Sequence, residues 1–454
     1  MSKFEEIVSL CKRRGFVYPS SEIYGGLANV YDYGPLGVEL LKNLRDLWWT
    51  EFVRKSTDTV GIESQIFMHP MVWKASGHVD GFSDPLIEDK VTNKRYRADH
   101  LIEDWILKNN KEKVDLDSLT IEELNQFIST NKIKSPDGNE LTQVKNFNLM
   151  FETDLGTVEG EKSKLYLRAE TAQGMYVLYK NILDSTRLKI PFGVAQHGKV
   201  FRNEITKGKF IFRTLEFEQM EIQYFIKENT WKESFENWRK KQENWYYNIL
   251  GIDKSLLRWK PHTKLVFYAK AAEDMQYKFD WGFDEVGGLH YRTDYDLGTH
   301  TKHSGQDLSY IDPNTNEKFL PHVVESTWGL NRNFFMVLDN AYKVEETRVV
   351  LNLSPKLAPY KIAVFPLVSN KEDIINKAKE VFKLLSDKYN TYWDDRGNIG
   401  KRYKYQDEIG TPYCITVDYD TLEIGQVTVR DRDTMEQEKI MIKDLDSYFS
   451  NKLL

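Results

Sequence analysis

The stretch from residue 201 to residue 221, FRNEITKGKFIFRTLEFEQME, constrains the fold more than any other part of the chain. It reads as two β-strands joined by a polar loop, and side chains two positions apart on a strand point to the same face. The first run therefore pairs Arg202 with Glu204, and the second pairs Phe217 with Glu221, about 13 Å apart. The same face of the second run also carries Arg213, Leu215 and Gln219. Guanidinium groups, an aromatic ring and carboxylates on one surface predict a site for a phosphate, a base and an ammonium group.

Composition places the chain among ordinary globular proteins. Its 454 residues are 41% hydrophobic and 29% charged, which excludes disorder and coiled coil and leaves room for a catalytic domain with appended domains. No apolar run is long enough to span a bilayer, and the N-terminus lacks the apolar core of a signal peptide, so we expect no membrane contact. The two cysteines, Cys11 and Cys414, favour a reducing cytoplasm and exclude a zinc site built from cysteines.

The pattern FRNE–loop–FRTLEF resembles the second signature motif of class II aminoacyl-tRNA synthetases, and nearly the whole chain resembles the homodimeric glycyl-tRNA synthetases. The resemblance implies an α+β class II catalytic domain, with an antiparallel sheet flanked by helices, and a C-terminal α/β anticodon-binding domain. It implies ATP-dependent attachment of glycine to tRNA(Gly) through a glycyl-adenylate, with release of AMP and pyrophosphate.

Changes in composition and hydrophobic pattern along the sequence divide the chain into four segments. Residues 1–87 hold the first part of the catalytic domain, 88–147 an inserted subdomain, 148–350 the catalytic core, and 357–454 the anticodon-binding domain. Helical spacing from residue 36 to 55, followed by a strand-like VGIESQIFMHP, resembles the first class II motif, which implies a homodimer. The insertion carries no cysteine pairs, so we predict no zinc there.

Four side chains, together with Arg202, are expected to bind ATP. A guanidinium can hold a phosphate oxygen and a carboxylate at once, so Arg202 suits the α-phosphate that glycine attacks. The resemblance implies that Phe217 stacks on adenine and that Arg332, in the third motif, covers its other face or reaches the γ-phosphate. Arg213 would serve the pyrophosphate end, and Glu204 would accept from the adenine amino group. Mg²⁺ is expected to bridge the phosphates, with ligands that the sequence leaves open.

Glycine offers only an ammonium group, a carboxylate and two hydrogens, so its site needs carboxylates and a filled side-chain space. Glu221 and Glu325 are the candidate ammonium ligands. The resemblance adds Glu170, which could instead serve a helix N-terminus, and Arg292 near the glycine carboxylate. Where the family has Glu-Pro-Ser, this chain has Glu-Ser-Thr, and the methyl group of Thr327 is expected to narrow the pocket.

Basic residues in the last segment are candidates for tRNA contact, namely Lys401, Arg402 and Lys404. The alternative is an ordinary solvated surface.

Two other functions stay open. One is an inactive class II paralogue that binds nucleic acid, such as a polymerase accessory subunit, and the retained Arg202 and Arg332 speak against it. The other is a class II enzyme for a different small amino acid. Two departures from the family, Ala169 for proline and Leu215 for arginine, leave the motif arginines in place.

Overall fold

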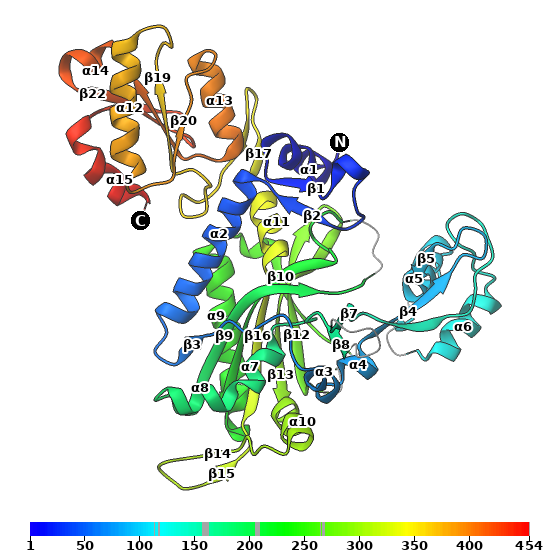
Figure 1. Cartoon of the computed structure of the whole chain (residues 1–454). Coiled ribbons are helices and arrows are strands. Elements are labelled where there is room, and N and C mark those ends of the chain that lie inside the picture. The colour runs from blue at the N-terminus through cyan, green and yellow to red at the C-terminus, as the bar shows by residue number, and fades with distance from the viewer. Residues whose placement is uncertain are drawn as a thin grey trace.

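The computed structural model describes residues 1–112, 114–116, 119–156, 163–204, 209–263, 265 and 268–453. A seven-stranded sheet forms its centre (Figure 1). The strand order is β11 (Leu257–Pro261), β12 (Ala271–Phe279), β13 (Gly282–Thr293), β16 (His322–Gly329), β10 (Glu216–Ile226), β9 (Phe192–Phe201) and β3 (Thr59–Gly61). Only β3 pairs in parallel, and the other neighbours are antiparallel. The expected antiparallel α+β core is confirmed.

Strand β10 separates the hydrophobic core from the polar face of the sheet. Met220, Ile222 and Tyr224 belong to the main core cluster. Gln219 and Glu221 alternate with them and line a pocket on the opposite face. The period of two in this stretch therefore assigns one face to packing and the other to binding.

Helices cover the apolar face of the sheet. They are α1 (Lys3–Arg14), α2 (Pro35–Trp49), α9 (Trp231–Asn244) and α11 (Leu330–Ala341). The predicted helix from residue 36 to 55 is α2 followed by a π turn, Thr50–Arg54. Pro35 occupies the first helical turn, where its missing N–H costs nothing. Trp238 of α9 and Trp245, which directly follows it, are buried in this core.

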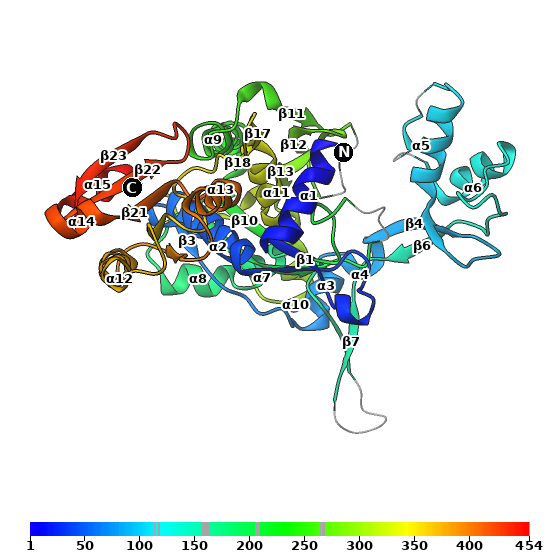
Figure 2. The ribbon, with the colours of Figure 1, turned by 90° about the horizontal axis from the view of Figure 1, so that it is seen from above.

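Shorter helices lie at the other side of the sheet. They are α3 (Pro70–Ala75), α4 (His78–Gly81), α7 (Ala172–Val177), α8 (Tyr179–Ser185) and α10 (Tyr295–Ser304). Small two-stranded pairs complete this body: β1 (Val17–Pro19) with β2 (Tyr31–Tyr33), β7 (Glu152–Leu155) with β8 (Ser163–Tyr166), and β14 (Tyr310–Ile311) with β15 (Lys318–Phe319). Figure 2 shows the β7 segment reaching away from the body.

Two predicted strands are shorter than the sequence suggested. The strand-like run VGIESQIFMHP keeps strand structure only in β3. Its last residue, Pro70, begins α3 because proline fits a first helical turn. The β9–β10 ladder ends at the pair of Phe201 with Glu216. Beyond it the backbone N–H of Asn203 donates to the carbonyl of Leu149, so the chain changes partner. Arg202, Glu204 and Arg213 consequently lie in loops, and residues 205–208 of the predicted loop lie outside the described residues.

The region predicted as an insertion forms a separate α+β unit to one side of the body (Figures 1 and 2). Its sheet has the order β5 (Arg95–Arg97), β4 (Ser83–Glu88), β6 (Lys145–Asn148). Helices α5 (Ala98–Lys108) and α6 (Ile121–Thr130) pack on it around their own apolar cluster. Helix α6 begins with a reciprocal capping box between Thr120 and Glu123.

The C-terminal unit is α/β, as expected, and its sheet is mixed. Its order is β20 (Thr391–Trp393), β19 (Ile362–Pro366), β21 (Tyr413–Val417), β22 (Gln426–Asp431), β23 (Gln437–Met441). The first three strands are parallel and the last two pair antiparallel. Around it lie α12 (Glu372–Ser386), α13 (Ile399–Ile409), α14 (Tyr419–Ile424) and α15 (Leu445–Leu453). The hairpin of β17 (Tyr342–Val344) and β18 (Val349–Leu351) links this unit to the central body, and β18 contacts α13.

Among the residues that the structure describes, no helix has the length and apolar character needed to cross a membrane.

Candidate active site

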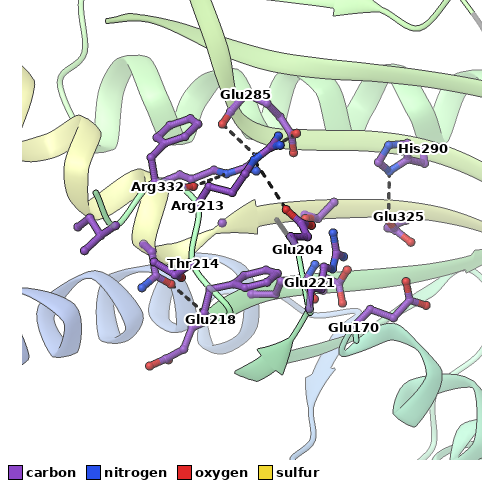
Figure 3. A pocket seen from close by; sticks show the side chains of 18 of the residues that line it. Glu170, Glu204, Arg213, Thr214, Glu218, Glu221, Glu285, His290, Glu325 and Arg332 are labelled. Carbon is purple, nitrogen blue, oxygen red and sulfur yellow. Dashed lines mark hydrogen bonds and ion pairs between the residues drawn. The ribbon is translucent and has the colours of Figure 1, made fainter. Parts of the chain in front are cut away.

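One pocket on the polar face of the sheet collects every residue that the sequence assigned to small molecules (Figure 3). Strands β10, β13 and β16 form its floor, and the loops around β9 and β10 form its rim. Lining it are Glu170, Arg202, Glu204, Arg213, Phe217, Glu221, Arg292, Glu325, Thr327 and Arg332. Their proximity is a structural finding, and the role of each stays a prediction.

Arginine and aromatic side chains gather at one end of the pocket. The guanidinium of Arg202 lies 5.3 Å from the ring centroid of Phe217, and its Nε donates to the carbonyl of Ala169 at 3.1 Å. The guanidinium of Arg332 lies 5.0 Å from the ring of Phe212. Planar cations beside aromatic rings make a surface on which a further flat ring can stack.

Carboxylates accompany the arginines at this end, as the upper part of Figure 3 shows. Arg332 pairs with Glu285 at 2.9 Å, and Arg213 lies 3.8 Å from Glu204. The side chain of Glu285 is 43% exposed, so its oxygens can reach a ligand. This end can therefore hold an anion on its guanidinium groups while carboxylate oxygens remain close by.

The other end of the pocket is acidic and buried. Glu170, Glu221 and Glu325 are each less than 10% exposed. They come from the loop before α7, from β10 and from β16, and Gln223 of β10 pairs in register with Glu325. The sheet therefore brings together carboxylates from segments that are far apart in the chain.

A single guanidinium crosses this acidic cluster. Arg292 is 2% exposed, and its Nε donates to Asp296 at 2.9 Å while Nη1 donates to Glu325 at 2.5 Å. Its Nη2 lies 3.7 Å from Glu170. The ring of Tyr268 stacks against it at 4.2 Å. Arg292 is thus engaged by three carboxylates, which it holds in place.

The buried, acidic surroundings raise the pKa of Glu221. Burial raises the pKa of Glu221 to about 8, and the neighbouring Glu325 and Glu170 add to the rise. The hydroxyl of Thr171 donates to Glu221 and opposes the shift only in part. Near neutral pH this carboxyl holds a proton in the free pocket, and an arriving cation would displace that proton.

The other two glutamates stay ionised. Burial favours the neutral form of Glu325, but Arg292 and then His290 lower its pKa to about 2. Burial also opposes ionisation of Glu170, and His78 together with Arg292 holds the pKa of that carboxyl well below its usual range. The acidic end therefore combines ionised carboxylates with one carboxyl that is ready to ionise.

Several residues in or beside the pocket were given no role from the sequence. His290 lies two positions before Arg292 on β13, and its Nδ1 is 3.1 Å from Glu325. Asp296 lies four positions after Arg292, on α10, so strand and helix periodicity around the arginine could have identified both. Tyr268 lies in an irregular segment with no periodic signal. Gln219 accepts from the backbone N–H of Thr171 at 3.3 Å and shares the predicted face of β10.

Of the departures around the third motif, only Thr327 reaches the pocket. Ser326 is fully buried on the helix side of β16, where it accepts from Gln242 at 2.7 Å. The side chain of Thr327 lies over Gly288, whose added Cβ would be 3.4 Å from the Thr327 methyl carbon. This places a methyl group at the wall of the pocket. Leu215 is not among the lining residues.

The predicted tRNA contacts need one correction. Lys401 and Lys404 are exposed on α13, but Arg402 is 2% exposed. Its guanidinium donates to the carbonyls of Arg396, Gly397 and two further residues, Pro366 and Asp395. Arg402 is buried because it satisfies carbonyls of the turn before α13 and that of Pro366 at the end of β19, so it is not available on the surface.

Comparison with known proteins agrees with this architecture. Residues 153–344 match the family model described as "tRNA synthetase class II core domain (G, H, P, S and T)", and residues 361–452 match "Anticodon binding domain". Together these models span more than half of the chain, and they cover the C-terminal sheet and every strand of the central sheet except β3.

Three bacterial relatives are similar along almost their whole length, and each is named glycine–tRNA ligase. The one from Acetivibrio thermocellus is 50% identical, over 99% of this chain and 98% of the relative. The one from Chlorobaculum tepidum is 48% identical, over 94% and 95%. The one from Borreliella burgdorferi strain B31 is 48% identical, over 100% and 98%. The chain belongs to the glycine–tRNA ligase family of class II aminoacyl-tRNA synthetases.

Proposed function

We propose that this chain activates glycine with ATP in the pocket between β10, β13 and β16 and then attaches it to tRNA(Gly). The carboxylate of glycine attacks the α-phosphorus of ATP, pyrophosphate leaves, and the glycyl-adenylate then passes its glycyl group to tRNA with release of AMP. The observation that carries this proposal is the pocket's division into an arginine-rich aromatic end and a buried acidic end. An aminoacyl-adenylate has the matching polarity.

The aromatic end is proposed to bind ATP. Phe217 stacks on adenine, and Arg332 covers the other face or meets the γ-phosphate. Glu204 accepts from the adenine amino group, and Arg213 holds the pyrophosphate end. Arg202 approaches both the α-phosphate and the glycine carboxylate, so it reduces the repulsion between two anions as they react. Most of the catalysis is then positioning and charge stabilisation by preformed groups.

Magnesium is proposed to bind together with ATP. Mg²⁺ takes oxygen ligands and usually keeps substrate phosphates in its coordination shell. The half-exposed Glu285, beside Arg332, is the carboxylate that suits it best, with Glu204 close to Arg213. The bound ion would neutralise charge on the phosphates while the arginines orient them.

The acidic end is proposed to bind glycine by its ammonium group. Glu170, Glu221 and Glu325 surround the space, and Arg292 pairs with two of them, Glu170 and Glu325. Thr327 occupies the position where a larger amino acid would place its first side-chain carbon. No natural amino acid is smaller than glycine, so steric rejection suffices for selection, whereas rejecting a smaller analogue is worth only about 1–3 kcal/mol per methylene.

The remaining expectations are proposals of the same kind. Residues 1–87 and 148–350 form the catalytic domain, 88–147 an insertion, and 357–454 the anticodon-binding domain. Lys401 and Lys404 contact the tRNA, and two copies pair through the first-motif helix α2. The enzyme acts in the cytoplasm, in keeping with the free, buried thiols of its two cysteines. Sedimentation analysis tests the dimer.

The decisive test of the function is amino-acid-dependent exchange of labelled pyrophosphate into ATP, measured with each of the twenty amino acids, with and without magnesium. Exchange with glycine alone, and only with magnesium, is expected. The Arg202→Ala protein should lose it, whereas Arg187→Ala, outside the pocket, should keep it. Exchange with a different amino acid would refute the assignment of the acidic end, and no exchange from folded protein would favour the inactive paralogue.

A further inference from the structure

A cluster of metal-ligating side chains lies beside the acidic end of the pocket, and only one of them, His290, also lines that pocket. His262 directly follows β11, Asp274 lies on β12, and His290 lies on β13. The Nε2 of His262 is 2.8 Å from an oxygen of Asp274. The rings of His262 and His290 meet edge to face, with centroids 5.8 Å apart. Three neighbouring strands thus bring two imidazoles and one carboxylate close together.

The strand register explains this meeting. The backbone N–H of His262 donates to the carbonyl of Ala272, which is paired with His290 across the next ladder. Asp274 is paired with Gly288. A Cβ added at Gly288 would lie 2.9 Å from Cε1 of the His290 ring. A glycine here therefore leaves the space in which the imidazole turns toward Asp274.

The distances suit a small divalent ion. One ligand atom from each of the three residues can be chosen so that all lie within 4.8 Å of one another. Two ligands about 2.1 Å from a tetrahedral zinc ion are about 3.4 Å apart, which lies between that limit and the present contact of His262 with Asp274. Each side chain is between 19% and 29% exposed, so an ion can enter with small side-chain rotations.

The surroundings of His290 are those of a metal-ligating histidine more than those of a side chain that only packs. Its Nδ1 is held by Glu325 at 3.1 Å, and no hydrogen bond to its Nε2 is found among the residues that the structure describes. A carboxylate that holds the second nitrogen of an imidazole is the usual support of a metal-ligating histidine, because it fixes the ring and its tautomer. Metal on Nε2 would keep the proton on Nδ1, so that His290 donates to Glu325.

We propose that His262, Asp274 and His290 bind one divalent transition-metal ion of the zinc class, with a fourth position open to water. Two imidazoles with one carboxylate suit such ions, whereas Mg²⁺ and Ca²⁺ prefer oxygen ligands alone. The sequence argument against zinc considered cysteine ligands, and these three residues need none. By fixing His290, the ion would also fix the orientation of Glu325, one wall of the proposed glycine site.

Metal binding itself is the test, so its outcome does not depend on catalysis. Chelator-treated protein is dialysed against Zn²⁺ and its metal content is measured, and Co²⁺ is added separately to record its visible absorption. The wild type and the control His303→Ala, which removes an exposed histidine of α10, should each bind about one ion per chain. His262→Ala and Asp274→Asn should each weaken binding by at least about 10-fold.

Circular dichroism melting of the metal-free proteins shows whether each variant is folded, and the wild-type result stands without any variant. Absence of Zn²⁺ uptake by the wild type would mean that His262 and Asp274 form an ion pair only, and it would overturn the proposal. Equal uptake by both folded ligand variants would overturn it as well. Neither result would bear on glycine activation, which the exchange assay tests separately.

Discussion

Two buried ionic clusters differ in charge balance. One lies in the pocket, and the other, which we call the joint, lies between β18 and the C-terminal unit. In the pocket, one guanidinium, that of Arg292, lies among four buried carboxylates: Glu170, Glu221, Asp296 and Glu325. His78 lies beside Glu170 and His290 beside Glu325. In the joint, Asp407 is 1% exposed and accepts two hydrogen bonds from Arg430, at 2.7 and 3.0 Å, and one from Arg348 at 2.9 Å. Arg348 also pairs with Glu345 at 2.6 Å. The joint thus matches two cations with two anions.

The contrast separates a structural use of buried charge from a binding use. In the joint every charge has a partner, so the cluster holds two units together and has no capacity left for a ligand. In the pocket, burial together with the neighbouring carboxylates raises the pKa of Glu221, so that this carboxyl retains a proton. That arrangement is unfavourable until a cation arrives, and the cation that glycine supplies is its ammonium group.

The largest effect is expected from breaking the balanced cluster. Asp407→Ala leaves the guanidinium groups of Arg348 and Arg430 buried without their shared partner, which should lower the free energy of unfolding by about 3–5 kcal/mol. Urea unfolding followed by circular dichroism measures it. The control Asp387→Ala, at the exposed end of α12, should change little. A loss below about 1 kcal/mol for Asp407→Ala would mean that the joint does not depend on this cluster.

Removing a carboxyl from the pocket cluster, in which negative charge is in excess, should not destabilise the protein. Glu221→Gln removes a carboxyl that is costly in the free protein, so stability should be kept or improved. Glycine would lose a charge-assisted hydrogen bond, and its KM in pyrophosphate exchange should rise about 10- to 100-fold. Glu216→Gln is the matched control, because Glu216 lies exposed on the same strand and pairs with Lys199. A destabilised Glu221→Gln protein with an unchanged KM for glycine would reverse the assignment.

The raised pKa of Glu221 should also make protein stability depend on pH. The pKa of Glu221 is raised on folding from 4.5 to about 8, so the native protein retains a proton that the unfolded chain releases. Its contribution should therefore make stability fall as pH rises from about 4.5 to about 8, by up to about 5 kcal/mol, and level off above. The difference between wild type and Glu221→Gln in unfolding free energy, measured across this range, isolates the effect. A difference that does not vary with pH would count against a raised pKa.

The smallest effect is expected at the surface of α13. A double change, Lys401→Ala with Lys404→Ala, should raise the KM for tRNA several-fold and leave pyrophosphate exchange unaltered, since each lysine contributes only a screened charge. Lys383→Ala, exposed on α12, serves as the control for lost surface charge. If charging of tRNA is unchanged in the double variant, these lysines belong to an ordinary solvated surface.

The two clusters also differ in how far the sequence could predict them. Phe217 and Glu221 share a face because strand periodicity is local, so that half of the pocket follows from the sequence alone. The joint does not, since Asp407 is 59 residues from Arg348 and 23 from Arg430, and no short-range pattern links them. The burial of Arg402 was missed for a similar reason, because its partners are backbone carbonyls of a turn that sequence patterns do not place.

Loop residues show the limit of the strand argument. Arg202 and Arg213 reach the pocket as predicted, but from beyond the ends of β9 and β10. The end of the ladder depends on Asn203 pairing with Leu149, a contact between distant segments. The sequence therefore predicted which residues meet, whereas the backbone that carries them was set by tertiary contacts.

The most direct test of the unbalanced cluster is a count of the protons released when glycine binds. Calorimetric titration at pH 7, in buffers of different ionisation enthalpy and with a non-hydrolysable ATP analogue present, gives that number at saturating glycine. We predict the release of close to one proton per glycine in the wild type and none in Glu221→Gln. Binding of glycine without proton release, or equal release by the two proteins, would contradict a protonated Glu221 that gives way to the ammonium group.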